Sequence, residues 1–131
     1  IRAGSISVLV AEDNVINMLL ARMIIQKIAP NANFMEAKNG VEAVKQCEQQ
    51  MPDLILMDVQ MPEMNGYEAT KQIRLMERSG RVPIIALTAS NVKGEKEKCM
   101  EAGMDDFVVK PIVEESLAMA LDKWLVSDAS A

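Results

Sequence analysis

The sequence has no histidine and few aromatic residues: one Trp, one Tyr and two Phe among 131 residues. The absence of histidine excludes histidine-based catalysis and histidine metal sites. Because aromatics are scarce, aliphatic residues and eleven methionines have to fill the core. The two cysteines, Cys47 and Cys99, fall in different predicted helices. We therefore expect reduced thiols and a cytoplasmic location rather than a disulfide framework.

Long apolar runs and an excess of basic residues are also absent. No apolar run approaches membrane-spanning length, and no signal peptide is recognisable, so we expect no membrane contact by this segment. With 14 basic against 19 acidic residues, the net charge is −5, which argues against nucleic-acid binding. The length suits one domain. We expect this domain over residues 7–126, linker or vector-derived residues over 1–6 and a flexible tail over 127–131. Because the chain begins without Met, we expect a segment of a longer protein.

Strand-like and helix-like stretches alternate along the chain. Short apolar runs indicate buried strands, and apolar residues at helical spacing indicate helices. We expect strands over residues 7–10, 33–37, 54–57, 83–87 and 107–109, and helices over 17–28, 41 to near 52, about 67–78, 93–102 and 114–125. Five successive strand–helix units imply an α/β domain, in which helices cover both faces of a parallel sheet.

Chemically active residues follow several of these strands directly. Glu12 and Asp13 follow the first strand, Asp58 the third, Thr88 the fourth and Lys110 the fifth. Ligands of open α/β sheets bind outside the carboxyl ends of the strands. Carboxylates crowded there would repel one another unless a divalent cation neutralised them. The pattern predicts a Mg²⁺ and phosphate site, with Asp58 as the group that is chemically changed.

Each of these residues also has a purely structural interpretation. Helix capping, a solvated strand end or an ordinary turn would account for Asp13 or Asn14, Asp58, Thr88 or Ser90, and Lys110-Pro111. Chance would rarely place acids, a hydroxyl and a lysine together at the ends of four strands. The combination therefore favours a shared site.

Four motifs carry a resemblance to a known family. They are Val10-Ala11-Glu12-Asp13-Asn14, the stretch from Leu56 to Gly66 (LMDVQMPEMNG), Leu87-Thr88-Ala89 and Val109-Lys110-Pro111. In order and spacing they resemble the receiver domain of two-component response regulators, over about residues 7–125. The resemblance implies a doubly wound, flavodoxin-like (βα)5 sheet with strand order 2-1-3-4-5. This order places the first and third strands side by side.

The resemblance also implies a role for each site residue. Asp58 is the phosphoacceptor, which attacks the phosphorus of a partner's phosphohistidine. Asp13, Asp58 and the backbone carbonyl of Gln60 bind Mg²⁺ (or Mn²⁺), and Glu12 acts through a metal-bound water. Lys110 pairs with one phosphoryl oxygen.

The remaining implied roles concern the phosphate cage, the switch and the lifetime of the phosphorylated state. Thr88 and the backbone N–H groups of Val59 and Ala89 complete the cage, and a cis peptide bond between Lys110 and Pro111 aims the lysine inward. Thr88 and Phe107 form the conformational switch, although Phe107 could also be a plain core residue. Gln60 and Ser90 tune the lifetime, so we expect their exchange to change dephosphorylation. Gly66 would permit close packing or an unusual backbone angle beside the site.

A phosphorelay receiver module is thus the favoured function, with a histidine kinase or a histidine phosphotransfer domain as its partner. Such a module assists its own phosphorylation and dephosphorylation but is not an enzyme. Details of the motifs resemble receivers fused to histidine kinases, which suggests a hybrid sensor kinase as parent, one that could be membrane-anchored. A standalone receiver, or a regulator without its output domain, is the alternative. Homodimerisation on phosphorylation stays open.

Two other functions fit less well. An aspartate-nucleophile phosphatase would need a second acid two residues after Asp58, where the sequence has Gln60. A flavodoxin-like cofactor binder would need a phosphate-cradling loop where the sequence has Glu12 and Asp13.

Overall fold

The computed structural model describes residues 6–77, 80–89 and 93–126 and contains one parallel sheet of five strands. The strands are β1 (Ser7–Ala11), β2 (Asn33–Ala37), β3 (Leu54–Asp58), β4 (Ile84–Thr88) and β5 (Asp106–Val109). The helices are α1 (Val15–Ile28), α2 (Gly40–Gln49), α3 (Gly66–Met76), α4 (Lys93–Ala102) and α5 (Glu114–Leu121), followed by a π-helical turn, η1 (Asp122–Val126). The strand order is β2-β1-β3-β4-β5, which confirms the predicted doubly wound fold.

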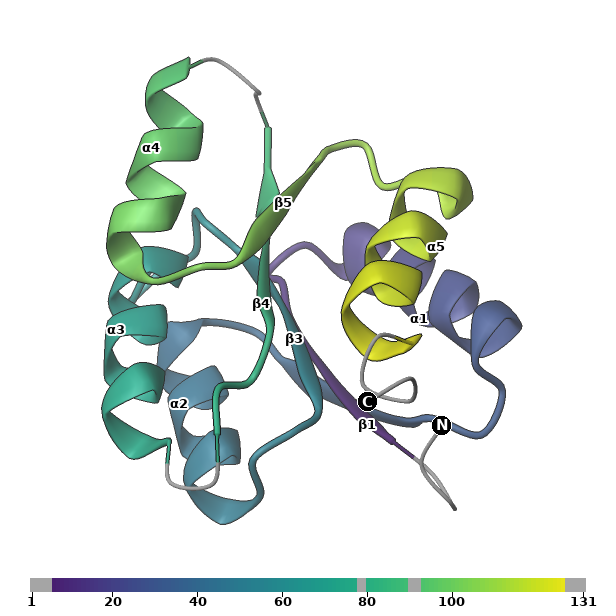
Figure 1. Cartoon of the computed structure of the whole chain (residues 1–131), viewed down its shortest axis with the longest axis horizontal. Coiled ribbons are helices and arrows are strands. Elements are labelled where there is room, and N and C mark those ends of the chain that lie inside the picture. Colours follow the sequence, from purple (N-terminus) through teal and green to yellow (C-terminus); the bar gives the residue numbers. More distant parts are fainter. Residues whose placement is uncertain (1–5, 78–79, 90–92, 127–131) are drawn as a thin grey trace.

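Helices cover both faces of the sheet (Figure 1). Because side chains alternate along a strand, neighbouring residues enter different layers. Leu9 and Ile55 join the apolar cluster beneath α2, α3 and α4, whereas Val8 and Leu56 join the cluster beneath α1 and α5. Every residue of β1, β3 and β4 is buried. The central strands are therefore held from both sides, and their carboxyl ends form a rigid platform.

Asparagine caps begin the first three helices. The side chains of Asn14, Asn39 and Asn65 each accept a hydrogen bond from the backbone N–H three residues later, at 2.9, 2.8 and 2.9 Å. The predicted helices began one or two residues too late, because the first turn of a capped helix need not carry inward-facing apolar residues. The capping interpretation of Asn14 is correct and coexists with the functional reading of its neighbours.

The last helix was predicted wrongly at its end. The sequence predicted a helix over 114–125, but the α-helix stops at Leu121 and the wider π-turn follows. Trp124 in that turn donates from Nε1 to Asp106 Oδ2 at 2.9 Å. Leu125 and Trp124 still pack against the cluster beneath α1 and α5, so the chain stays helical through residue 125, as predicted, although the helix type changes.

Three further predictions concern the ends of the chain, the cysteines and membranes. The expected linker, apart from residue 6, and the expected tail lie outside the described residues. Cys47 and Cys99 are free and buried, and burial raises the pKa of both thiols, to about 12 for Cys47. Within the described ranges, no helix combines the length and apolarity needed to cross a bilayer.

Candidate functional site

The fold brings the predicted site residues to one edge of the sheet. Asp58 and Thr88 are the last residues of β3 and β4. Glu12 directly follows β1, and its N–H donates to Ala37 O at 2.9 Å. Lys110 directly follows β5, and its N–H donates to Thr88 O at 2.7 Å. The first bond ties the end of β1 to β2, and the second ties the end of β5 to β4. The pairing of β3 with both β1 and β4 places Asp58 between them.

Lys110 joins two of the acids. Its Nζ lies 2.9 Å from Asp58 Oδ2 and 3.0 Å from Glu12 Oε1. Burial lowers the pKa of Lys110, but the hydrogen bonds and charges of Asp58 and Glu12 outweigh it and raise the pKa above its usual value. The ammonium therefore stays charged between the two carboxylates. The peptide bond from Lys110 to Pro111 is cis, as the resemblance implies.

The acids form a compact cluster. Carboxylate oxygens of Glu12, Asp13 and Asp58 lie within 4.8 Å of one another. Glu12 and Asp58 are only 2% and 3% exposed, whereas Asp13 faces solvent. Burial, together with the neighbouring Asp58, raises the pKa of Glu12 to about 7. The cluster thus holds more negative charge than Lys110 alone can neutralise.

This donor set fits a hard divalent cation such as Mg²⁺, which prefers oxygen ligands and retains several waters. Glu12 Oε1 is buried and finds no hydrogen-bond partner of good geometry among the described residues, although the Lys110 ammonium lies nearby. Its other oxygen accepts from Asn14 N–H at 3.1 Å. A cation beside Asp13 and Asp58 would relieve the repulsion and leave Glu12 a role through water.

The two backbone N–H groups that follow Asp58 have different partners. The N–H of Gln60 donates to Asp58 Oδ1 at 3.1 Å, and the Gln60 side chain is exposed. The N–H of Val59 donates to Leu87 O at 3.1 Å, within the sheet. The predicted role of Val59 in holding phosphate would therefore require this bond to be released or shared.

Gly66 packs closely against the backbone of Asp58. A Cβ atom at Gly66 would overlap the carbonyl oxygen of Asp58, and the Gly66 N–H donates to Val59 O at 3.1 Å. Gly66 therefore serves close packing, one of its two predicted uses, and its backbone angle is ordinary. The loop before it contains the strained residue Glu63, with φ of 67°.

The remaining predicted residues lie around this centre. Thr88 is buried beside it, and Ala89 is exposed. Phe107 is half-buried and packs against the cluster beneath α2, α3 and α4. This placement suits both interpretations of Phe107. Ser90 lies outside the described residues.

Sequence reasoning missed one support of the loop after β3. The N–H of Gly40 donates to Met64 O at 3.0 Å, and a Cβ atom at Gly40 would overlap that oxygen. In the sequence, an Asn-Gly pair such as Asn39-Gly40 is typical of a turn. Nothing in the local pattern points to a contact with a loop more than twenty residues away.

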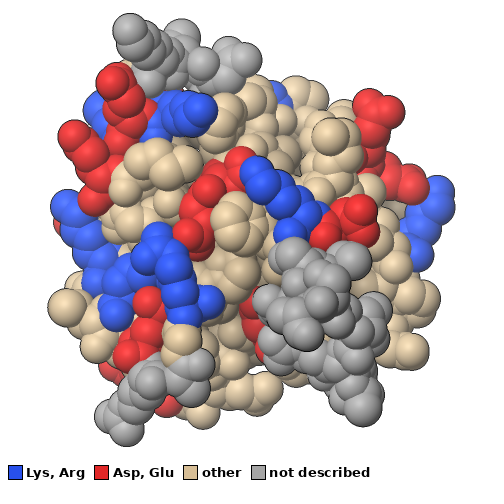
Figure 2. All heavy atoms as spheres, viewed as in Figure 1, with Lys and Arg blue, Asp and Glu red and all other residues tan. Residues whose placement is uncertain are grey.

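Charges of both signs share the surface around the site. On the face shown in Figure 2, lysine and arginine side chains are interspersed with aspartate and glutamate. The coloured residues of that view form no broad basic patch, in keeping with the net charge of −5.

Comparison with known proteins gives a consistent family assignment. The family model described as the response regulator receiver domain matches residues 8–122. The sensor protein GacS of Pseudomonas syringae pv. syringae is 40% identical over 120 residues, which cover 89% of this chain and 13% of GacS. The chain thus spans a small part of the length of this relative.

Two solved structures agree in fold and sequence. The receiver domain of sensor histidine kinase PA1611 from Pseudomonas aeruginosa, with magnesium in its active-site cleft, is 38% identical with a TM-score of 0.82, covering 93% of this chain and 98% of that one. The receiver domain of Ssk1 was solved with the histidine phosphotransfer protein Ypd1 of Saccharomyces cerevisiae. That match is 34% identical with a TM-score of 0.86 and covers 98% of this chain and 94% of the matched chain.

Proposed function

Because this chain belongs to the response regulator receiver domains of two-component signalling, we propose that Asp58 is its phosphoacceptor and takes a phosphoryl group from a partner's phosphohistidine. The observation that carries the proposal is the arrangement at the sheet edge. The buried Asp58 carboxylate lies beside two further acids, and Lys110 Nζ lies 2.9 Å from its Oδ2. This arrangement suits phosphoryl transfer, which depends on positioning and charge neutralisation.

In the proposed step, an Asp58 carboxylate oxygen attacks phosphorus and forms the O–P bond. The N–P bond breaks, and its electron pair returns to the imidazole nitrogen of the partner. Lys110 neutralises charge on a phosphoryl oxygen, and Thr88 and the N–H groups of Val59 and Ala89 donate to the others. The product is an acyl phosphate on Asp58. The domain is accordingly a phosphoacceptor module rather than a catalyst that turns over a substrate.

Asp13, Asp58 and the Gln60 carbonyl would hold Mg²⁺, with Glu12 contributing through water. When bound, the cation neutralises carboxylate and phosphoryl charge together. The acidic cluster supports this assignment through its donor chemistry and its excess negative charge. Phe107 as switch, and Gln60 and Ser90 as lifetime determinants, belong to the same proposal.

Intact mass spectrometry after incubation with acetyl phosphate and Mg²⁺ tests the function. We expect the mass of one phosphoryl group to be gained, and to be lost with EDTA or in Asp58→Asn. A protein that stays folded, binds Mg²⁺ and gains no phosphoryl group would contradict the proposal. A mass gain that persists in Asp58→Asn would show that another residue is the phosphoacceptor.

The partner surface is proposed on α1. Val15, Ile16, Leu19 and Met23 are exposed apolar residues, and three of them follow at helical spacing along one side. The helix begins at Val15, two residues after Asp13, so this stripe borders the acceptor site. An exposed apolar stripe beside a reactive group suits docking of a helical partner that presents its phosphohistidine. Histidine phosphotransfer proteins and histidine kinases are the proposed partners.

Leu19→Lys tests this surface. Leu19 is 52% exposed, so the substitution should leave folding intact, but a charge in an apolar contact should slow transfer from phosphorylated Ypd1 about tenfold or more. Phosphorylation by acetyl phosphate should not change. Leu75→Lys on α3, at an 88% exposed leucine, is the matched control and should accept at the wild-type rate. Equal rates for both variants would exclude α1 as the docking face.

A hybrid sensor kinase is the proposed parent protein. GacS and PA1611 are both sensor proteins, and the chain matches a small segment of GacS. A receiver within such a kinase would accept its phosphoryl group from the same protein and pass it on to a phosphotransfer partner.

A further inference from the structure

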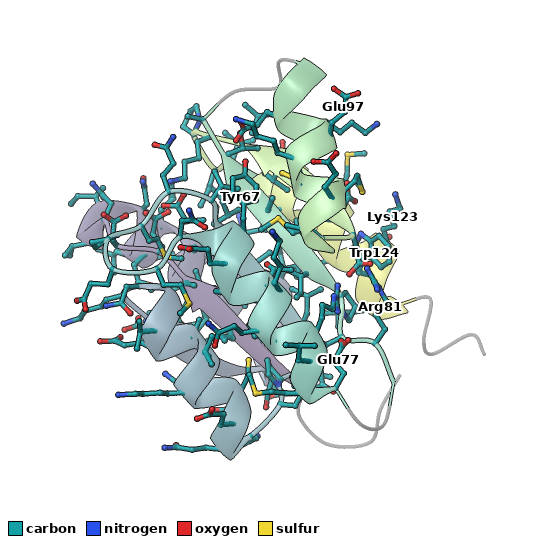
Figure 3. The ribbon with its side chains drawn as sticks, turned by 90° about the vertical axis from the view of Figure 1, so that its left-hand side faces the viewer. Tyr67, Glu77, Arg81, Glu97, Lys123 and Trp124 are labelled. Carbon is teal, nitrogen blue, oxygen red and sulfur yellow. The ribbon has the colours of Figure 1, made fainter. Side chains whose placement is uncertain are left out.

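Tyr67 forms a direct link between α3 and α4. Its hydroxyl donates to Glu95 Oε1 at 2.9 Å, and the two residues lie in the first turns of their helices. The ring is half-buried and packs against the cluster beneath α2, α3 and α4. Figure 3 shows Tyr67 at the end of α3 that lies toward α4, with Glu77 at the other end.

The Tyr67 end of this link is fixed to the acceptor. Gly66, which precedes Tyr67, rests against the Asp58 carbonyl so closely that a Cβ atom would overlap it. Gly66 N–H also donates to Val59 O at 3.1 Å. The backbone from which Tyr67 starts therefore packs directly against the backbone of Asp58 and Val59.

The Glu95 end belongs to a weakly buried helix. Gly94, Lys96, Glu97 and Lys98 are exposed, and the next buried residue is Cys99, one turn after Glu95 and also beside the Tyr67 hydroxyl. Burial and the hydrogen bond to Glu95 raise the pKa of Tyr67, so the hydroxyl keeps its proton at neutral pH. The first turn of α4 is thus held by Tyr67 more than by burial.

Only a short stretch of chain separates α4 from the site. Thr88 ends β4 and α4 begins at Lys93, so four residues join them. In this structure Lys110 lies against Asp58, and Val59 N–H donates to Leu87 O beside Thr88. If a phosphoryl group on Asp58 takes the Val59 N–H, the bond from Val59 to Leu87 O is lost, and with it one tie between β3 and the end of β4, four residues before α4.

We propose that the hydrogen bond between Tyr67 and Glu95 is a latch that holds α4 in the unphosphorylated position and so restrains phosphorylation of Asp58. The inference rests on the proposed function and adds Tyr67 as a positioning residue. When α4 moves so that Glu95 separates from Tyr67, the hydrogen bond is lost. The bond therefore stabilises the α4 position of this structure relative to a moved one.

Tyr67→Phe keeps the ring and removes only the hydroxyl. We expect its initial rate of phosphorylation by acetyl phosphate to rise about threefold to tenfold, the effect of losing one net hydrogen bond. Glu95→Ala should give the same increase, and the double variant should not exceed either single variant. Glu95→Gln keeps an acceptor and should stay near the wild-type rate, as should Glu97→Ala on the exposed side of α4. Unchanged or slower rates, or additive effects, would overturn the latch.

Hydrogen exchange separates this inference from the proposed function. Tyr67→Phe should speed amide exchange in α4 and leave β1 and β3 unchanged, whether or not phosphate is accepted. If the wild type takes no phosphoryl group, the proposed function fails, and the exchange result still decides whether Tyr67 anchors α4. Unchanged exchange in α4 would refute the anchor.

Discussion

Arg74→Met is expected to lower the free energy of unfolding by about 3–5 kcal/mol, because it leaves two largely buried carboxylates without their main cation. The Arg74 side chain is 13% exposed, and its guanidinium lies 2.6 Å from Glu77 and 2.7 Å from Asp105, whose side chains are 13% and 10% exposed. It also donates to the carbonyls of Gly103 and Val82. Methionine keeps the packing of the stem, so the loss would report the charge and its hydrogen bonds.

Arg81→Met provides the matched control. Arg81 lies 2.8 Å from the same Asp105 and also donates to Gly103 O, but it is 57% exposed. Solvent screens such a pair, so we expect a loss of about 0–1 kcal/mol. Urea unfolding monitored through Trp124, the single tryptophan, gives both values. Equal losses of unfolding free energy in the two variants would show that burial does not determine how much these ion pairs stabilise the fold.

The sequence had given no sign of the Arg74 network. In the sequence, Ala69, Ile73 and Met76 recur at helical spacing and indicate the apolar side of this helix, whereas Arg74 between them is typical of any helix position. Its partners Gly103 and Asp105 lie about thirty residues further along the chain. Only the folded topology, which packs α3 beside α4, brings them together.

The site was more predictable than the network because strand order does most of the positioning. Asp58, Thr88 and Lys110 each directly end or follow a short apolar run, and parallel strands align their carboxyl ends. Side-chain contacts between different helices were not predicted. The hydroxyl of Tyr67 meets Glu95 across two helices, and no local spacing encodes that meeting.

Helix types and backbone donors set another limit on prediction. Over five residues, apolar spacing does not distinguish an α-helix from the π-turn at Asp122–Val126. The resemblance assigned Val59 N–H to phosphate, yet in this structure it bonds Leu87 O. A donor's partner depends on the state of the site, which the identity of Val59 does not specify.

Lys110→Met is expected to reduce the initial rate of Asp58 phosphorylation about 10²–10³-fold, the usual cost of removing one preorganised charge-stabilising donor. The ammonium lies 2.9 Å from Asp58 Oδ2 and 3.0 Å from Glu12 Oε1, where charge would build up during transfer. Methionine fills similar space without the charge. Phosphorylation by acetyl phosphate, followed by intact mass, measures the rate.

Mg²⁺ binding distinguishes this effect from simple damage to the site. Removing one positive charge beside Glu12, Asp13 and Asp58 should strengthen their attraction for a divalent cation, so titration calorimetry should show Mg²⁺ affinity retained or increased while the rate falls. Lys27→Met is the control. Lys27 is exposed and pairs with Glu114 at 3.0 Å, away from the site, so neither quantity should change. A near-normal phosphorylation rate in Lys110→Met would show that Lys110 does not contribute to the transfer step. Loss of both Mg²⁺ binding and rate would mean instead that Lys110 positions the acidic cluster. The positive charge of Lys110 repels Mg²⁺, so Lys110 could favour Mg²⁺ binding only by holding the carboxylates in place.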